Sequence, residues 1–158
     1  MPQLSMHSPL GSLTLTEEDG ALISLDWGRG RDQENTPFLE QACAWLDAWF
    51  DHPGGVFPLP MRPHGTVYQR RVWDVLLTIP CGQTLTYGEV ASLVGGSPRS
   101  VGGAVGSNPI PILIPCHRVL GAKGLGGFSS DGGVDDKRWL LELERGETGG
   151  VQSCLPVS

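Results

Sequence analysis

A stretch rich in proline and glycine, residues 53–65, constrains the fold of this chain more than any other feature. It holds four prolines and three glycines, and neither residue type readily continues a helix or a central strand. With 158 residues, the chain has room for one ordinary domain or for two small lobes that share contacts. We therefore place a lobe boundary here, with residues 1–64 before it and residues 65–158 after it.

The first lobe has the pattern of a β-hairpin followed by a helix. Apolar residues alternate within residues 12–16 and 22–27, and an acidic turn that ends in Gly20 separates the two segments. Residues 37–50 then carry apolar residues at helical spacing. These patterns predict a hairpin and an amphipathic helix in the first lobe.

The second lobe carries two adjacent helix start signals. Thr86 and Glu89 have the spacing of a capping box, and their helix is expected to stop at Gly95. Ser97 and Pro98 then have the pattern of a second helix start. Two short helices joined by a tight glycine turn predict a helix-turn-helix.

Other segments flank this helix pair. Thr66 is expected to cap an earlier helix, and a last helix is expected to start at Asp135 or Asp136. Between them, residues 108–120 are apolar and bounded by prolines, which predicts an extended segment. Residues 125–133 are rich in glycine and serine and predict a loop.

Charge and cysteine content narrow the classes of function. The formal net charge is −6, but residues 65–130 hold five basic and two acidic side chains, so a locally basic face that binds nucleic acid is compatible with the sequence. The four cysteines show no C-x-x-C pair, which argues against a zinc ribbon and a disulfide framework, and we expect reduced thiols in a cytoplasm. We find no signal-peptide pattern and no apolar run of the roughly 18 residues that a membrane span needs.

The segment around Cys116 and His117 has the residue types of a nucleophilic site. A thiol becomes a good nucleophile when its pKa is lowered or when a base removes its proton. Neighbours on a regular strand face opposite ways, but Pro115 interrupts the strand, so a bend could bring both side chains to one site. Glu144 on the last helix could orient the imidazole. For the pair alone, a buried cysteine beside a surface histidine remains the ordinary alternative.

The wider sequence favours a specific family. Residues 108–119 read Asn-Pro-Ile-Pro-Ile-Leu-Ile-Pro-Cys-His-Arg-Val. Together with Ile79-Pro80 and four longer motifs, this segment resembles the active-site region of O6-alkylguanine-DNA alkyltransferases, also called methylated-DNA–protein-cysteine methyltransferases. The resemblance spans about residues 66–145 and is looser at residues 8–14. The other motifs are Tyr68-Gln-Arg-Arg-Val-Trp73, Thr86-Tyr-Gly-Glu-Val-Ala91, Val101-Gly-Gly-Ala104 and Lys137-Arg-Trp-Leu-Leu-Glu-Leu-Glu144.

The resemblance implies a fold and a function. The fold would be α/β, with a ribonuclease-H-like N-terminal lobe and a winged helix-turn-helix C-terminal lobe. The function would be direct repair of O6-methylguanine, and more weakly O4-methylthymine, in double-stranded DNA. The alkyl group would pass irreversibly to Cys116 after nucleotide flipping. The protein would act as a cytoplasmic monomer, without a metal, an organic cofactor or a membrane.

The resemblance also implies catalytic roles. Cys116 corresponds to the alkyl acceptor, and His117 corresponds to the histidine that activates it through a bound water. Glu144, rather than Glu142, corresponds to the carboxylate that partners the histidine. Asn108 corresponds to the asparagine that ties the recognition helix to the active-site segment.

A second group of residues is implied to bind DNA or the target base. Tyr87 would crowd the target phosphate, and Arg99 would enter the base stack beside Ser100. Gly102 and Gly103 would let DNA approach the helix closely. The expected pocket residues are Val119, Phe128 and Ser129.

Three departures from the family pattern concern DNA affinity and adduct range. Many relatives carry a basic residue near Gly106, and here it is absent. The turn at residues 95–98 is short by about two residues relative to some relatives, and Ser130 and Asp131 are apparent insertions. Three rival functions differ in what they leave unexplained. A lesion-binding protein without transferase activity commonly lacks the acceptor cysteine, a transcription regulator would not need the Cys-His site, and a cysteine hydrolase would not need the helix-turn-helix.

Overall fold

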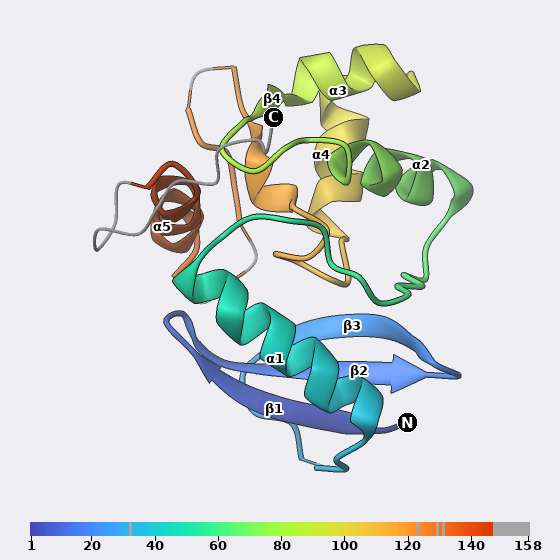
Figure 1. Cartoon of the computed structure of the whole chain (residues 1–158). Coiled ribbons are helices and arrows are strands. Elements are labelled where there is room, and N and C mark those ends of the chain that lie inside the picture. Colours follow the sequence, from blue (N-terminus) through green and yellow to red (C-terminus); the bar gives the residue numbers. More distant parts are fainter. Residues whose placement is uncertain (32, 123, 129, 131, 147–158) are drawn as a thin grey trace.

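The computed structural model is mixed α/β and describes residues 1–146 except residues 32, 123, 129 and 131. In Figure 1 a sheet and one long helix lie on one side, and the later helices gather on the other. A continuous hydrophobic core joins the two sides. No helix in the described part of the chain has the length and apolar character that a membrane crossing requires.

The sheet has the strand order β1-β2-β3 and is antiparallel throughout. Its strands are β1 (Gln3–Ser8), β2 (Gly11–Glu18) and β3 (Ala21–Trp27). Asp19 and Gly20 connect β2 to β3 with φ values of 49° and 78°, as a type I′ turn requires. The predicted hairpin is confirmed, whereas β1 is an additional strand that the sequence pattern did not indicate.

Helix α1 (Pro37–Asp51) covers one face of this sheet (Figure 1). Thr36 caps it by accepting a hydrogen bond from the Leu39 amide, and Pro37 occupies the first turn, where its missing amide costs nothing. The predicted amphipathic helix is confirmed. Its buried side chains are Leu39, Ala42, Leu46, Trp49 and Phe50.

The proline-rich segment is attached to the sheet rather than free. The Leu22 amide donates to the Pro60 carbonyl over 2.9 Å, and the Arg62 amide donates to the Leu22 carbonyl over 2.8 Å. The Leu25 amide also donates to the Pro109 carbonyl over 2.9 Å. Strand β3 is therefore hydrogen-bonded directly to the segment that leads to Cys116.

Three later helices pack against one another and share a way of starting. Each has a capping box, in which the N-cap hydroxyl and the third helical residue exchange hydrogen bonds. Trp73 Nε1 donates to the Ala104 carbonyl over 2.8 Å and so joins the first of these helices to the third. The predicted helix starts are confirmed. The helices and their N-caps are α2 (Val67–Leu76, Thr66), α3 (Tyr87–Val94, Thr86) and α4 (Pro98–Gly106, Ser97).

Residues 108–120 do not form the predicted extended segment. They fold into turns and a short 3₁₀ helix at Cys116–Arg118, and only β5 (Val119–Leu120) is a strand, paired in parallel with β4 (Leu85–Thr86). Three prolines in this segment remove amide donors that strand pairing would use, and Ile112 has a φ of 72°. The prediction was wrong because these features favour turns over a continuous strand.

Helix α5 (Val134–Glu144) follows and begins one or two residues before the expected start at Asp135 or Asp136. The cysteines also depart from expectation. Cys43 and Cys116 are free thiols, but Cys81 is disulfide-bonded, so the expectation of reduced thiols is wrong for Cys81. Spacing along the chain does not reveal which sulfur atoms meet in space.

Candidate active site

Cys116 lines a cavity of about 350 Å³ between two helices and a loop. Cys116 is 5% exposed, so little of the residue is open to bulk solvent. A volume of this size is in the range of small-molecule sites. The other lining residues are Tyr87 from α3, Gly102, Val105 and Gly106 from α4, and Gly127 and Phe128 from the loop before α5.

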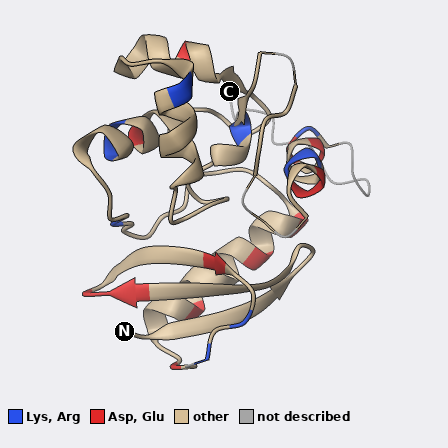
Figure 2. Ribbon diagram, turned by 180° about the vertical axis from the view of Figure 1, so that it is seen from behind, with Lys and Arg blue, Asp and Glu red and all other residues tan. Residues whose placement is uncertain are grey.

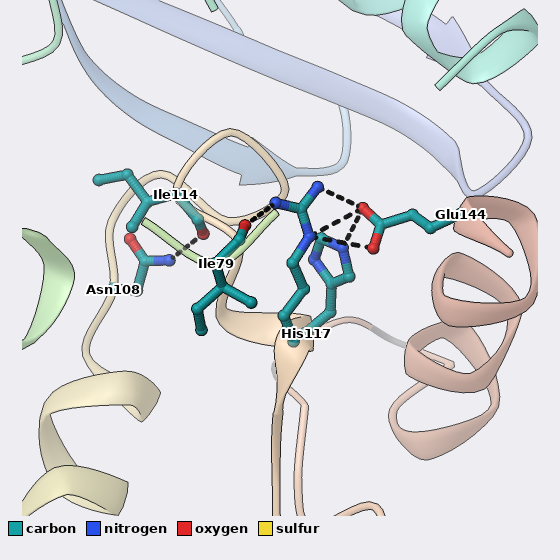
Figure 3. A network of polar contacts seen from close by, with 6 residues as sticks. Ile79, Asn108, Ile114, His117 and Glu144 are labelled. Carbon is teal, nitrogen blue, oxygen red and sulfur yellow. Dashed lines mark hydrogen bonds and ion pairs between the residues drawn. The ribbon is translucent and has the colours of Figure 1, made fainter. Parts of the chain in front are cut away.

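Asn108 holds the backbone before Cys116 in its bent form. Its side-chain amide donates to the Ile114 carbonyl over 2.8 Å (Figure 3), and its side-chain oxygen accepts from the Ile110 amide over 3.0 Å. Asn108 lies two residues after α4 ends at Gly106. This geometry ties α4 to the segment that carries the thiol.

His117 and Glu144 form a fully buried pair. The histidine Nε2 lies 2.8 Å from the Glu144 Oε2, and both side chains have zero exposure (Figure 3). Burial works to raise the pKa of Glu144, but His117 and Arg118 outweigh it and lower the pKa from 4.5 to about 2. The carboxylate is therefore ionised at neutral pH and can only accept hydrogen bonds.

The ionised carboxylate fixes the tautomer of the imidazole. With an acceptor at Nε2, the proton of neutral His117 lies on Nε2, and Nδ1 keeps its lone pair. Nδ1 is buried and has no hydrogen-bond partner among the described residues. A buried nitrogen with a free lone pair, next in sequence to a thiol, has the chemistry of a proton acceptor.

Arg118 is a member of this cluster that the sequence did not single out. Its Nη2 donates to Glu144 Oε2 over 2.6 Å, and its Nε donates to both carboxylate oxygens. Its Nη1 donates to the Ile79 carbonyl over 2.6 Å (Figure 3). The guanidinium thus connects Glu144 to the end of the segment after α2, and it holds the carboxylate ionised.

Lys137 is a second member that sequence reasoning missed. Its side chain is buried, and its Nζ donates to the Val119 carbonyl over 2.7 Å and to the Gly127 carbonyl over 3.2 Å. The Nζ also lies 5.9 Å from the centre of the Tyr87 ring. Burial lowers the pKa of Lys137, while the neighbouring Cys116 raises it. A signal existed in the sequence, because Lys137 shares the helical spacing of the buried residues Leu140, Leu141 and Glu144.

These neighbours act on the thiol in opposite directions. Burial raises the pKa of Cys116, whereas a hydrogen bond from the Asn108 side chain and the charge of Lys137 lower it. The net direction is upward, so burial favours the protonated form of the thiol. Nucleophilic chemistry at Cys116 therefore needs a base, and the buried histidine is suited to that task.

We compared the chain with models of known protein families. A family model described as "6-O-methylguanine DNA methyltransferase, DNA binding domain" matches residues 67–146. The chain belongs to this methyltransferase family. The resemblance found in the sequence is thereby confirmed.

Relatives match over most of the chain. The methylated-DNA–protein-cysteine methyltransferase of Mycobacterium leprae is 43% identical over 152 residues, which cover 89% of this chain and 90% of the relative. The protein of the same name from Methanosarcina acetivorans is 38% identical over 149 residues, or 87% and 94% of the two chains. Among solved structures, Mycobacterium tuberculosis OGT in complex with DNA matches with a TM-score of 0.82 and 39% identity, covering 93% of this chain and 94% of that chain.

The residues that the methyltransferase resemblance assigned to DNA differ in exposure and in whether they line the cavity. Arg99, Ser100 and Gly103 are exposed on α4, while Tyr87 and Gly102 are half-buried and line the cavity. The Ser100 hydroxyl already has partners, since it accepts from the Ser97 amide and lies 2.9 Å from the Tyr68 hydroxyl. Its contacts are those of a helix cap.

The expected pocket residues are only partly brought together. Phe128 lines the cavity, but Val119 is buried outside it, with its carbonyl bound by Lys137. Ser129 lies outside the described residues, as does Asp131. Ser130 and the Gly132 amide both donate to the Asp136 carboxylate, which ties this loop to α5.

Proposed function

We propose that the protein repairs alkylated DNA by moving the alkyl group of O6-methylguanine, and more weakly that of O4-methylthymine, to the sulfur of Cys116. The observation that carries this proposal is a free thiol that lines a base-sized cavity beside a buried His117–Glu144 pair. The names of the relatives, methylated-DNA–protein-cysteine methyltransferases, support the same reaction.

The proposed reaction is a direct displacement. His117 Nδ1 accepts the thiol proton through a bound water, and the sulfur attacks the alkyl carbon attached to O6. The sulfur–carbon bond forms as the carbon–oxygen bond breaks, and the electron pair goes to O6 of the guanine. The proton returns to the guanine, which leaves neutral, while Glu144 stabilises the transient imidazolium. Because a thioether is a poor leaving group, each molecule acts once, and no metal or cofactor takes part.

The proposed DNA interface is the outer face of α4. A base in a duplex hides its O6, so the nucleotide must rotate out to reach the cavity. Arg99 would fill the vacated stack, Tyr87 would crowd the target phosphate, and Gly102 and Gly103 would permit close approach. Ser100 would flank this contact. Figure 2 shows basic positions on α2 and near the start of α4, while acidic positions mark the sheet and α1.

The proposed architecture follows the family. The sheet and α1 would form a ribonuclease-H-like lobe within residues 1–64, and α2 to α5 would form a winged helix-turn-helix lobe within residues 65–158. The α3–α4 pair, with its three-residue connection Gly95–Ser97, supports the second assignment. We propose that the protein acts on double-stranded DNA as a cytoplasmic monomer.

An intact-mass measurement tests the reaction. After mixing with a duplex that carries O6-methylguanine, the protein should gain the mass of one methylene group, mapped to Cys116. Cys116→Ser should gain nothing and should still bind the duplex. An unchanged wild-type mass with tight lesion binding would instead indicate the rival, a lesion-binding protein without transferase activity.

A further inference from the structure

We propose that Trp27, in the first half of the chain, is a positioning residue that sets which O6 adducts the cavity accepts, because it holds Phe128 in place as part of the cavity wall. This inference rests on the proposed function and concerns the substrate range of the same site. Trp27 does not line the cavity itself, so it would act through the phenyl ring.

The contact between the two rings crosses from the sheet to the cavity. Trp27 is the last residue of β3, where its backbone is paired with Leu13 of β2. Its ring lies 5.6 Å from the ring of Phe128, centre to centre, with the planes at 70°. This edge-to-face arrangement is a favourable geometry for an aromatic pair and restricts how both rings can turn.

The wall segment, defined here as residues 126–128, is held at three points. A Cβ at Gly126 would lie 2.9 Å from the Tyr87 hydroxyl, so the backbone passes tightly over that ring. The Gly127 carbonyl accepts a hydrogen bond from Lys137, and Phe128 rests on Trp27. Trp27 is the only one of these three supports that comes from the first half of the chain.

The wall segment is rich in glycine, so its position depends on contacts such as that between Phe128 and Trp27. Two of its three residues are glycines, and Gly126 has a φ of 75°, so the backbone has little resistance of its own to movement. Phe128 is half-buried and supplies the segment's one side chain to the cavity. Without the indole, the phenyl ring can move away from the cavity, which enlarges the space beside Cys116.

Enlargement affects small and large adducts differently. A methyl adduct depends on a close wall to hold the base and its O6 at reacting distance from the sulfur. A benzyl adduct needs more room and fills the enlarged space itself. Loss of Trp27 should therefore raise the rate of benzyl transfer relative to methyl transfer.

The test measures single-turnover rates with free O6-benzylguanine and free O6-methylguanine, which require no DNA binding. In Trp27→Ala the benzyl-to-methyl rate ratio should rise by about threefold or more, while Trp27→Phe, which keeps an aromatic ring, should stay close to wild type. An unchanged ratio in Trp27→Ala would overturn the proposal. Absence of transfer by the wild-type protein with either base would instead count against the proposed function.

Trp45 provides a matched control in the same part of the molecule. It makes a similar edge-to-face contact with Phe57, at 5.4 Å and 83°, and neither ring lines this cavity. Trp45→Ala should lower stability but leave the rate ratio unchanged. A shift of the same size in Trp45→Ala would show that the effect is general loosening, and would overturn the assignment to Trp27.

A double variant tests whether Trp27 acts through Phe128. In Phe128→Ala the wall ring is already absent, so adding Trp27→Ala should not change the rate ratio further. An equal further shift in the double variant would contradict the proposed path. If Trp27→Ala does not fold, Trp27→Leu serves in both experiments, since it keeps apolar bulk but loses the edge-to-face contact.

Discussion

The polar side chains behind Cys116 and those on the outer face of α4 are held in opposite ways. His117, Lys137 and Glu144 have zero exposure, and each is fixed by protein partners. The Arg99 side chain, by contrast, is exposed on α4. A buried polar group is stable only with partners, so the fold determines its chemistry, whereas an exposed group gains its function from whatever binds it. Variants on the buried side should therefore affect folding and reaction together, and variants on the exposed side should affect DNA binding without slowing the reaction with a free base.

The largest effect is expected from Glu144→Ala, which removes the carboxylate that His117 and Arg118 contact. Arg118 would lose its carboxylate partner and stay buried with an uncompensated charge, which costs about 3–5 kcal/mol. Methyl transfer should also slow by about 100-fold, because the imidazole loses its orienting acceptor. Urea unfolding and single-turnover rates measure the two effects. Glu142→Ala on the same helix is the control, and it should change stability by less than about 0.5 kcal/mol. Wild-type rates in Glu144→Ala would remove this carboxylate from the mechanism.

A second effect on the buried side appears in acid. The pKa of Glu144 is lowered from 4.5 to about 2 in the folded protein, so this group stabilises the fold above pH 4.5 and loses that contribution as pH falls toward 2. The loss is on the order of 3 kcal/mol. The free energy of unfolding, measured by urea titration across this window, should fall less steeply in Glu144→Gln. Parallel curves for the two proteins would contradict the assignment.

A smaller effect is expected from Lys137→Met, which keeps the bulk and removes the charge. Because Lys137 lowers the pKa of Cys116, its loss should slow transfer at neutral pH by about tenfold and move the pH–rate profile to higher pH. Arg138→Met on the exposed side of the same helix is the control and should leave the profile in place. A slower rate without a shift of the profile would mean that Lys137 only supports the loop at Gly127.

The distance along the chain between interacting residues explains which elements the sequence predicted. Helix starts at Thr66, Thr86 and Ser97 were predicted because capping is local, with donor and acceptor three residues apart. The pairing of β4 with β5 was not predicted. Strands of two residues are too short to show an alternating apolar pattern, and the two strands are distant in sequence. The 3₁₀ helix at Cys116–Arg118 was also missed, since apolar residues between prolines resemble a strand.

Some residues of the site were given roles from the sequence, and others were not. Cys116, His117 and Glu144 were given roles through an ordered resemblance, and His117 and Glu144 lie in hydrogen-bond contact. Lys137 and Arg118 stand in the same motifs but were not given roles. Charged side chains are normally exposed, so a lysine within an apolar stripe is easily taken for the edge of that stripe. Only three-dimensional contacts show that its Nζ is satisfied by two backbone carbonyls.

On the exposed side, Arg99→Ala should slow repair of a lesion in DNA but not the transfer reaction itself. Repair of a duplex lesion should slow by about fivefold, because the stack vacated by the flipped base is no longer filled. Reaction with free O6-benzylguanine needs no flipping and should keep its wild-type rate. Equal losses on both substrates would place Arg99 among the residues that support the fold, despite its exposure.

The smallest effect is expected from Gly103→Ala, which should change stability and DNA affinity in opposite directions. A Cβ at Gly103 would meet no atom within 4 Å, and glycine inside a helix is less stable than alanine by about 0.5–1 kcal/mol. The free protein should therefore become slightly more stable in thermal unfolding. The same methyl group would stand where DNA is proposed to approach α4, so affinity for duplex DNA should fall. Gly106→Ala is the comparison on the same helix, since its Cβ is also unobstructed but Gly106 lines the cavity. Gly103→Ala with unchanged duplex affinity would mean that DNA does not approach α4 at this position.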